Sequence, residues 1–336
     1  MESRTGRTLK FVWATAAAIL FAHGIVFAEP LRNGFNLAGA LVPVEEILQG
    51  GPPKDGIPAI DRPAFLGARD ATDLRPDDMV LAIFRNGIAK AYPIRILNWH
   101  EVVNDRFGAD DVVITFCPLC GSGVAFESKA GSRALRFGVS GLLYNSDVLL
   151  YDRETHSLWS QIRAQAVAGP LKGGRLTAVP VLHTTWADWR ARHPDSRGLT
   201  QKTGFSRDYD GDPYAGYEKS ADLIFPVRFR AEGYHPKERV LGIVLEGKAK
   251  AYPFVEMAKG AGEVADTVAG HAVRIRYSRE HQSAEVFDAK GQPLVSITLF
   301  WFAWAAFHPD TEIYRAPSSK AGAKPPARLR TRSSKE

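Results

Sequence analysis

The two cysteines of the chain, Cys117 and Cys120, lie three positions apart in the segment VVITFCPLCGSGVAFE, residues 112–127. β-branched and aromatic residues precede them, a Gly-Ser-Gly segment follows, and a second apolar run then begins. Apolar runs on both sides of a Pro- and Gly-rich segment predict a β-hairpin. We therefore expect both thiols at the tip of a hairpin, and we expect the chemistry of the protein at that tip.

Three kinds of role are open to this cysteine pair. Covalent haem attachment is excluded because Gly121, not histidine, follows the second cysteine. A thioredoxin-type site is disfavoured because a turn and a strand-like run follow the pair, where that site has the N-terminus of a helix. Thiol–disulfide redox cycling, as in an oxidoreductase, is our leading hypothesis. A Cys-Pro-x-Cys-Gly sequence is also typical of a zinc knuckle, and an inert disulfide in a scaffold protein is the third possibility.

Histidine is the expected partner of the thiols in either chemical role. The predicted catalytic set is Cys117, Cys120 and His100, since a neighbouring imidazole can act as an acid or base or lower a thiol pKa. In the metal-binding alternative, His100 and His156 would join the cysteines as ligands of zinc or copper, because a two-cysteine site needs further ligands. The supporting residues that we expect around the site are Asn98, Glu101, Asn104, Asn145, Asp147, Trp159 and Gln161.

One passage of the chain recurs about 160 residues later. VLAIFRNGIAKAYP at 80–93 matches VLGIVLEGKAKAYP at 240–253. The cysteine segment at 112–127 then matches the segment at 273–288, in the same order along the chain. Trp-x-x-Trp and His-Pro-Asp then recur in both copies. Three matches in the same order indicate an internal duplication. The second copy has Ser278 and His281 where the first has cysteines, so we expect only the first copy to carry a working site.

From this repeat we expect a β-rich α+β fold, in which two related β-rich units from an internal duplication pack together. The expected divisions are a signal peptide at 1–28, an N-terminal wrap at 29–75, a first unit with the cysteines and an insertion at 76–198, a linker loop at 199–235, a degenerate second unit at 236–312, and a disordered basic tail at 313–336.

Local patterns predict individual elements inside the first unit. Alternating apolar residues on both sides of Asn86-Gly87 predict a hairpin. Residues 94–105 are expected to form a helix, on which His100 and Asn104 share a face. The insertion at 137–161 contains LLYNSDVLLYD, which predicts a strand, a turn and a second strand, and we expect it to form a wall over the thiols.

The two ends of the chain carry most of its formal net charge of +6. The first 28 residues combine a basic start, an apolar stretch and Val-Phe-Ala, which is typical of a cleaved signal peptide, with an uncleaved membrane anchor as the alternative. We expect an extracytoplasmic protein, periplasmic or secreted, with a possible redox partner protein there. The body has no basic excess that favours nucleic acid, and membrane contact is expected only through the leader or the basic tail.

Several segments together resemble the domain of unknown function 3179 family. They are WHEVVND (99–105), ITFCPLCGSGVAFE (114–127), SGLLYNSDVLLYDRET (140–155), SLWSQ (157–161), TWADW (185–189) and DPYAGY (212–217). The resemblance implies an exported or membrane-anchored bacterial or archaeal protein without an established activity. It also implies that some members carry selenocysteine at the cysteine motif, which would favour redox chemistry at Cys117 or Cys120. The basic tail departs from the family.

Overall fold

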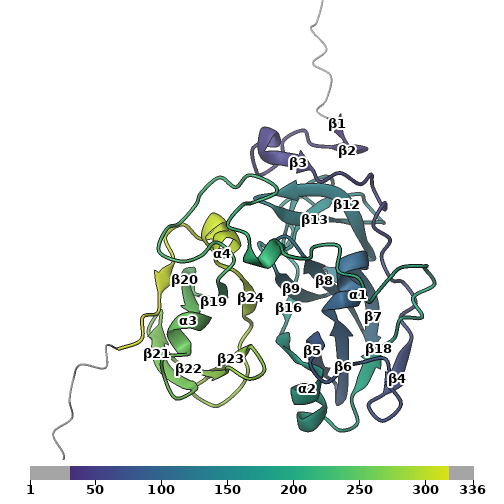
Figure 1. Ribbon diagram of the computed structural model, residues 1–336. Helices are drawn as coiled ribbons and strands as arrows, with labels where there is room; N and C mark the ends of the chain where they lie inside the picture. Colours follow the sequence, from purple (N-terminus) through teal and green to yellow (C-terminus); the bar gives the residue numbers. More distant parts are fainter. Residues whose placement is uncertain (1–30, 318–336) are drawn as a thin grey trace, which may run out of the picture.

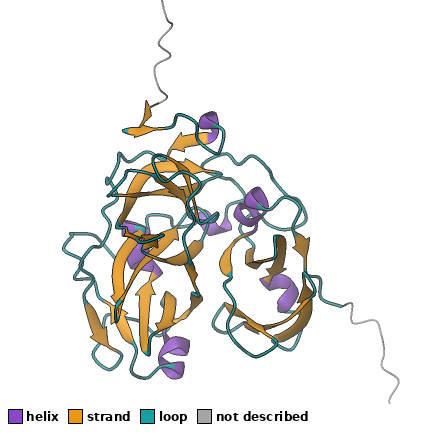
Figure 2. Ribbon diagram, turned by 180° about the vertical axis from the view of Figure 1, so that it is seen from behind, coloured by secondary structure: helices purple, strands orange, loops and turns teal. Residues whose placement is uncertain are grey.

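The computed structural model describes residues 31–317 of the chain, which build five β-sheets of three to five strands. These sheets have a five-blade β-propeller arrangement. In Figure 1 the sheets of the purple-to-teal part of the chain lie at the top and right, and those of the green-to-yellow part lie on the left. The helices are short, and strands and loops make up most of the body in the reverse view (Figure 2). The predicted signal peptide at 1–28 and residues 318–336 of the predicted tail lie outside the described residues.

Three of the sheets come from the region of the chain that precedes residue 200. The first contains β4 (Phe65–Gly67), β5 (Met79–Arg85), β6 (Ile88–Pro93), β17 (Leu182–Thr185) and β18 (Arg197–Leu199). The second contains β7 (Val102–Phe107), β8 (Asp110–Cys117), β9 (Ser122–Glu127) and β16 (Ala178–Val179). The third contains β3 (Ile47–Gln49), β12 (Phe137–Tyr144), β13 (Asp147–Asp152), β14 (Leu158–Ser160) and β15 (Gln165–Ala168).

The other two large sheets come from the C-terminal part. They are β19 (Arg239–Leu245), β20 (Lys248–Pro253), β24 (Ile297–Phe300) and β25 (Glu312–Ile313), and then β21 (Glu263–Val268), β22 (His271–Ser278) and β23 (Ser283–Asp288). Two strand pairs complete the set: β1 (Leu31–Arg32) with β2 (Phe35–Asn36), and β10 (Lys129–Ala130) with β11 (Arg133–Ala134). The helices are α1 (Ile94–His100), α2 (Trp186–Arg192), α3 (Phe254–Met257) and α4 (Trp301–Phe307), with 3-10 turns η1 (Val44–Glu46) and η2 (Tyr217–Lys219).

The expected α+β fold of two duplicated units packed together is wrong. The predicted first unit is divided among three sheets, because its hairpins pair within separate sheets and each sheet buries its faces against its neighbours. Repetition is present at the level of single sheets. β5 pairs Val80 with Pro93 of β6, and β19 pairs Val240 with Pro253 of β20 in the same register.

Turn chemistry correctly predicts the hairpins of the N-terminal half. Asn86 and Gly87 join β5 to β6 with φ of 52° and 73°, as a type I′ turn requires. β8 and β9 form the predicted cysteine hairpin. In the insertion, β12 and β13 pair across Asn145 and Ser146, which have φ of 52° and 61°. This tight turn fixes the direction of the residue that follows it.

The predicted helix over 94–105 is wrong in its second half. α1 ends at His100, and Glu101 has a left-handed φ of 57° while its N–H donates to the Leu97 carbonyl at 2.8 Å. The next residues, beginning with the β-branched pair Val102 and Val103, form β7. Asn104 therefore lies on a strand, and it shares no helical face with His100.

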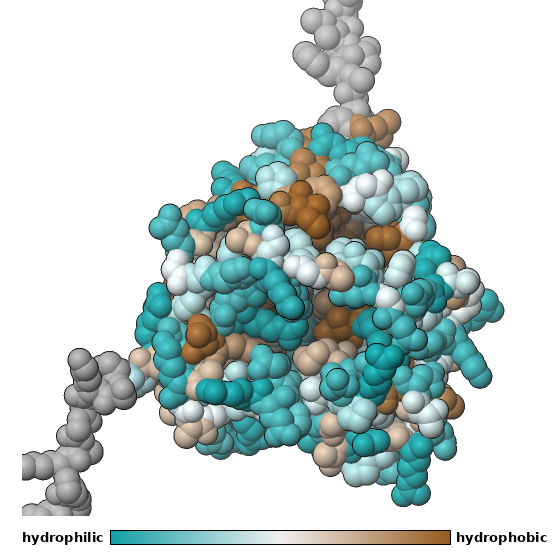
Figure 3. Space-filling model, viewed as in Figure 1, coloured by the Kyte–Doolittle hydropathy of each residue, from teal (hydrophilic) through white to brown (hydrophobic). Residues whose placement is uncertain are grey.

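Parts of the segment before residue 76 pair with the sheets. Ile60 bridges to Val103 of β7, and β4 pairs with β18. The face of the molecule in Figure 3 is largely hydrophilic, with small and separate hydrophobic patches. Between residues 31 and 317, no helix has both the length and the apolar character needed to cross a membrane.

His183 of β17 makes the stability of the fold depend on pH. Its imidazole is buried beside the Gly123 carbonyl, at 3.4 Å, and burial followed by the nearby charge of Arg239 lowers its pKa to about 3. The unfolded chain binds a proton here below a pH of about 6.5, so the free energy of unfolding falls as pH drops from there toward the folded pKa. We expect an additional loss on the order of 2 kcal/mol between pH 7 and 5.

Urea unfolding of the wild type and of His183→Gln across this pH range measures that loss. The variant lacks the titrating group, so its stability should decline less steeply with falling pH. Equal slopes in the two proteins would show that His183 does not govern the acid sensitivity.

Candidate metal centre

The β8–β9 hairpin places both thiols inside the molecule. Cys117 ends β8 and pairs with Ser122 at the start of β9, so the turn between them carries Cys120. No disulfide joins the two cysteines in the structure, and their residues are 1% and 0% exposed. Gly121 has a φ of 59°, and a Cβ there would lie 2.9 Å from the Phe300 ring, so only glycine fits. The Cys120 carbonyl accepts from the Phe300 N–H at 2.8 Å, which ties the turn to β24.

The insertion covers the thiols through the turn between β12 and β13. The Ser146 carbonyl accepts hydrogen bonds from the Cys117 and Cys120 thiols, at S–O distances of 3.6 and 3.4 Å. Asp147 follows this turn, and it is fully buried. Cys117, Cys120 and Asp147 each offer one ligand atom, and the three atoms lie within 4.8 Å of one another. In residues 31–317 this is the one such group of three or more His, Cys, Asp or Glu side chains.

The Asp147 carboxyl is incompletely satisfied by the protein. Its Oδ2 accepts from the Ile162 N–H at 3.2 Å, whereas its Oδ1 is buried and has no hydrogen-bond partner within the described part of the chain. Burial raises the pKa of Asp147 to about 8, against the opposing effect of the nearby Ile162 and Val148 amides and the Ser122 and Cys117 side chains. Of these groups, only the Ile162 N–H has hydrogen-bond geometry to the carboxylate, since the Ser122 hydroxyl donates to Gln161 and the Cys117 thiol to the Ser146 carbonyl. A buried polar atom without a partner costs free energy, so Oδ1 is a strong candidate for contact with a ligand.

The acidic groups of the site are buried close together, so ionisation of each one disfavours ionisation of the others unless a cation is bound. Burial, then the hydrogen bond and charge of Cys117 and the charge of Asp147, raise the pKa of Cys120 well above its ordinary value. Burial and the charge of Asp147 raise the pKa of Glu101 to about 8. Without a cation these groups stay protonated at neutral pH, because several anions cannot share a small volume of low dielectric.

Two tyrosines that sequence reasoning missed lie beside the turn of the cysteine hairpin. Tyr214 and Tyr217 come from the loop between β18 and β19, and with Pro118 and Gly121 they line a cavity of about 240 Å³. Burial and then the charges of Cys120 and Cys117 raise the pKa of Tyr217, whose buried hydroxyl lacks a hydrogen-bond partner among residues 31–317. The DPYAGY segment was the available signal, although nothing in its spacing indicated contact with the thiols.

The structure does not bring the predicted histidines into the group of ligands. His100 is buried, its Nδ1 is 2.7 Å from the Pro58 carbonyl, and its Nε2 is 2.6 Å from the Tyr209 hydroxyl. Burial is the main cause that lowers the pKa of His100. His156 packs its ring against Phe35 and Tyr151, at centroid distances of 6.4 and 5.8 Å. The third ligand atom belongs to Asp147, which the sequence placed among the supporting residues.

Gln161 is the supporting residue that braces the hairpin directly. Its Oε1 accepts from the Ser122 hydroxyl at 2.6 Å, and its Nε2 donates to the Thr115 hydroxyl at 2.8 Å. The other predicted supporting side chains hold adjacent segments: Asn98 donates to Asp212, Asn104 donates to Asp61 and the Phe137 carbonyl, Asn145 donates to the Ala306 carbonyl, and the Trp159 indole donates to Asp152.

Comparison with known protein families assigns most of the chain to one family. Residues 54–311 match the family described as "Protein of unknown function (DUF3179)". The chain belongs to this family. The match confirms the resemblance drawn from the cysteine, insertion and tyrosine-loop segments, and it includes every residue of the group around Asp147. No curated protein and no solved structure gave a match. The DUF3179 description names no activity, so the function has to be argued from the geometry of the site.

Proposed function

We propose that this protein binds a zinc ion through Cys117, Cys120 and Asp147. The observation that carries the proposal is the buried Asp147 Oδ1, which has no partner in the described chain and lies in a group whose three ligand atoms are within 4.8 Å of one another. A cation at this point would satisfy the orphaned oxygen. It would also stabilise the deprotonated thiols, whose charge is otherwise unfavourable in a buried site.

The mixture of donor atoms favours zinc over copper. Zn²⁺ accepts both thiolate sulfur and carboxylate oxygen, whereas Cu(I) selects soft ligands such as cysteine and methionine. Asp147 supplies a hard oxygen to the group, which Zn²⁺ accepts more readily than Cu(I) does. Asp147 also takes the place that the sequence analysis gave to His100 or His156.

Three protein ligands leave one position of a tetrahedral zinc site for another group. Structural zinc sites have four protein ligands, whereas three ligands and an open position are typical of catalytic sites. Zinc with an open position activates a bound water or polarises a carbonyl oxygen. The tyrosine-lined cavity beside Pro118 and Gly121 adjoins the same turn. The arrangement thus supports a zinc site with three protein ligands, next to a cavity that Tyr214 and Tyr217 line.

A redox-active dithiol is the second candidate, and one observation favours it. Both thiols bond to the same Ser146 carbonyl, and their sulfur atoms are within 4.8 Å of each other, so they are neighbours before any bridge forms. Two features weigh against exchange with a partner protein: the cysteines are at most 1% exposed, and the pKa of Cys120 is raised. Attack on a disulfide requires an accessible thiolate.

Elemental analysis of protein purified without added chelator tests the proposal. We expect about one zinc per chain in the wild type and in Asp266→Asn, a control that alters a carboxylate paired with Lys250 and Tyr252. Asp147→Asn should lose most of the metal, because the amide is a weaker ligand for zinc than a carboxylate.

A wild type that stays free of metal, even after reconstitution with zinc, would contradict the proposal. Alkylation followed by intact mass then separates the other two roles. A reversible bridge in a thiol buffer supports redox cycling, and a bridge that resists reduction supports a structural disulfide.

A further inference from the structure

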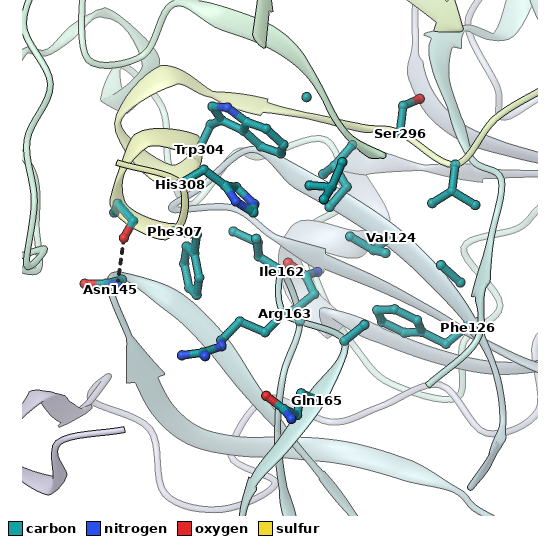
Figure 4. A pocket seen from close by; sticks show the side chains of 18 of the residues that line it. Val124, Phe126, Asn145, Ile162, Arg163, Gln165, Ser296, Trp304, Phe307 and His308 are labelled. Carbon is teal, nitrogen blue, oxygen red and sulfur yellow. Dashed lines mark hydrogen bonds between the residues drawn. The ribbon is translucent and has the colours of Figure 1, made fainter. Parts of the chain in front are cut away.

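A second cavity, of about 470 Å³, lies between β9, β19, β24 and α4 (Figure 4). Much of its wall is apolar, with aromatic side chains from two distant parts of the chain. Phe126 comes from β9, and Trp304 and Phe307 come from α4. Val244 and Val295 extend the apolar lining and are 45% and 42% exposed. The size is that of an ordinary small-molecule site.

The charged side chains of this cavity are all cationic. Arg163 and Arg175 line it, and no aspartate or glutamate does. Both arginines are exposed, and neither guanidinium has an ion pair or a side-chain hydrogen bond within residues 31–317. Two unpaired guanidiniums beside an apolar wall attract anions, and their planar forks fit a carboxylate or a sulfonate.

The remaining polar groups of the cavity are neutral. The His308 ring packs at a tilt of 38° against Trp304 with ring centroids 4.1 Å apart, and burial followed by the charge of Arg163 lowers its pKa to about 4, so it carries no charge at neutral pH. Figure 4 shows Gln165 and Ser296 among the labelled side chains around the same space. Amide and hydroxyl groups of this kind can orient a ligand without repelling a negative charge.

We propose that this cavity binds a small amphipathic organic anion, with its apolar body against Phe126, Trp304 and Phe307 and its acidic group held by Arg163 and Arg175. The inference goes beyond the zinc site and does not depend on it. The two sites meet at Gln161 and Ile162, which line the cavity and also contact the metal centre, Gln161 through Ser122 and Ile162 through the amide that bonds Asp147.

Two fluorescent probes that differ in one charged group test this proposal. Anilinonaphthalene sulfonate has an aromatic body with an anionic group, and phenylnaphthylamine has the same body without it. We expect the wild-type protein to bind one sulfonate probe per chain, at least about tenfold more tightly than the neutral probe, because each charge-assisted hydrogen bond contributes substantially to binding.

The Arg163→Gln/Arg175→Gln variant should lose this preference. The matched control, Arg133→Gln/Arg197→Gln, removes the same charge from exposed positions outside the cavity and should keep it. Ser296→Trp, which fills the cavity and retains both arginines, should weaken the binding of both probes. The proposal is overturned if the two double variants bind the sulfonate equally well, or if Ser296→Trp leaves both affinities unchanged.

Discussion

Replacing Cys120 with serine is expected to lower the affinity of the protein for zinc by more than about a hundredfold, beyond the 10–100-fold typical of changes to residues that only support the ligands. The substitution removes a soft thiolate ligand, and the serine hydroxyl that replaces it next to Asp147 does not ionise at neutral pH. Cys117→Ser should have an effect of the same size. Competition with a chromophoric chelator measures the affinities at fixed pH.

Ser160→Ala is a suitable control for these variants. Ser160 is buried on β14, and its hydroxyl has no hydrogen-bond partner among the described residues, so its loss should leave both stability and zinc affinity nearly unchanged. If Cys120→Ser retains the affinity of Ser160→Ala, the thiols are not zinc ligands and the proposed function fails.

Replacing Trp159 with alanine is expected to destabilise the fold by about 3–5 kcal/mol, the range for deletion of a large buried aromatic side chain. Trp159 is 0% exposed, it packs edge-on against Phe137 at 6.1 Å, and its indole N–H donates to Asp152 at 2.8 Å. The substitution leaves a cavity and removes one donor from a buried carboxylate. Because β14 leads directly to Gln161, the brace of the cysteine hairpin should weaken as well.

Urea unfolding of Trp159→Ala and Trp159→Phe at neutral pH separates these contributions. Phenylalanine keeps most of the apolar contact and lacks only the indole donor. The free energy of unfolding should therefore fall clearly less in Trp159→Phe than in Trp159→Ala. A loss below about 1 kcal/mol for the alanine variant would mean that the third sheet does not depend on this side chain.

The elements that the sequence predicts well are those fixed by neighbouring residues. Asn86-Gly87 and Asn145-Ser146 both adopt the positive φ values that a tight hairpin needs, and such turns depend on the turn residues themselves. The cysteine hairpin follows from two apolar runs and a glycine-rich turn. Local pattern was sufficient for these elements, and it placed both thiols at the correct tip.

The errors arose where long-range packing decides the outcome. Residues 102–105 continue a plausible helical pattern, yet Val102 and Val103 pair with β8 and gain burial on a sheet. The repeated segments similarly suggested two compact units. Contacts between distant strands decide whether a hairpin packs with the other strands of its own copy or becomes part of a separate blade. The pattern of one segment does not specify these contacts.

The candidate site was predicted in part for the same reason. Both cysteines and the insertion that covers them are identifiable from the sequence, because one is a motif and the other is absent from the second copy. His100 was chosen for its chemistry and its nearness in sequence, but its ring nitrogens face Pro58 and Tyr209. Asp147 lies 30 and 27 positions from the two cysteines and reaches them only through the pairing of β12 with β13.

X-ray absorption at the zinc edge of the reconstituted wild-type protein tests the central claim most directly. The proposed ligands predict two sulfur atoms at about 2.3 Å and lighter oxygen atoms at about 2.0–2.2 Å around the metal. In the fraction of Asp147→Asn that retains zinc, the oxygen contribution should decrease while the sulfur contribution stays. A zinc environment without sulfur, or one with four sulfur atoms from two chains, would contradict the site formed by Cys117, Cys120 and Asp147.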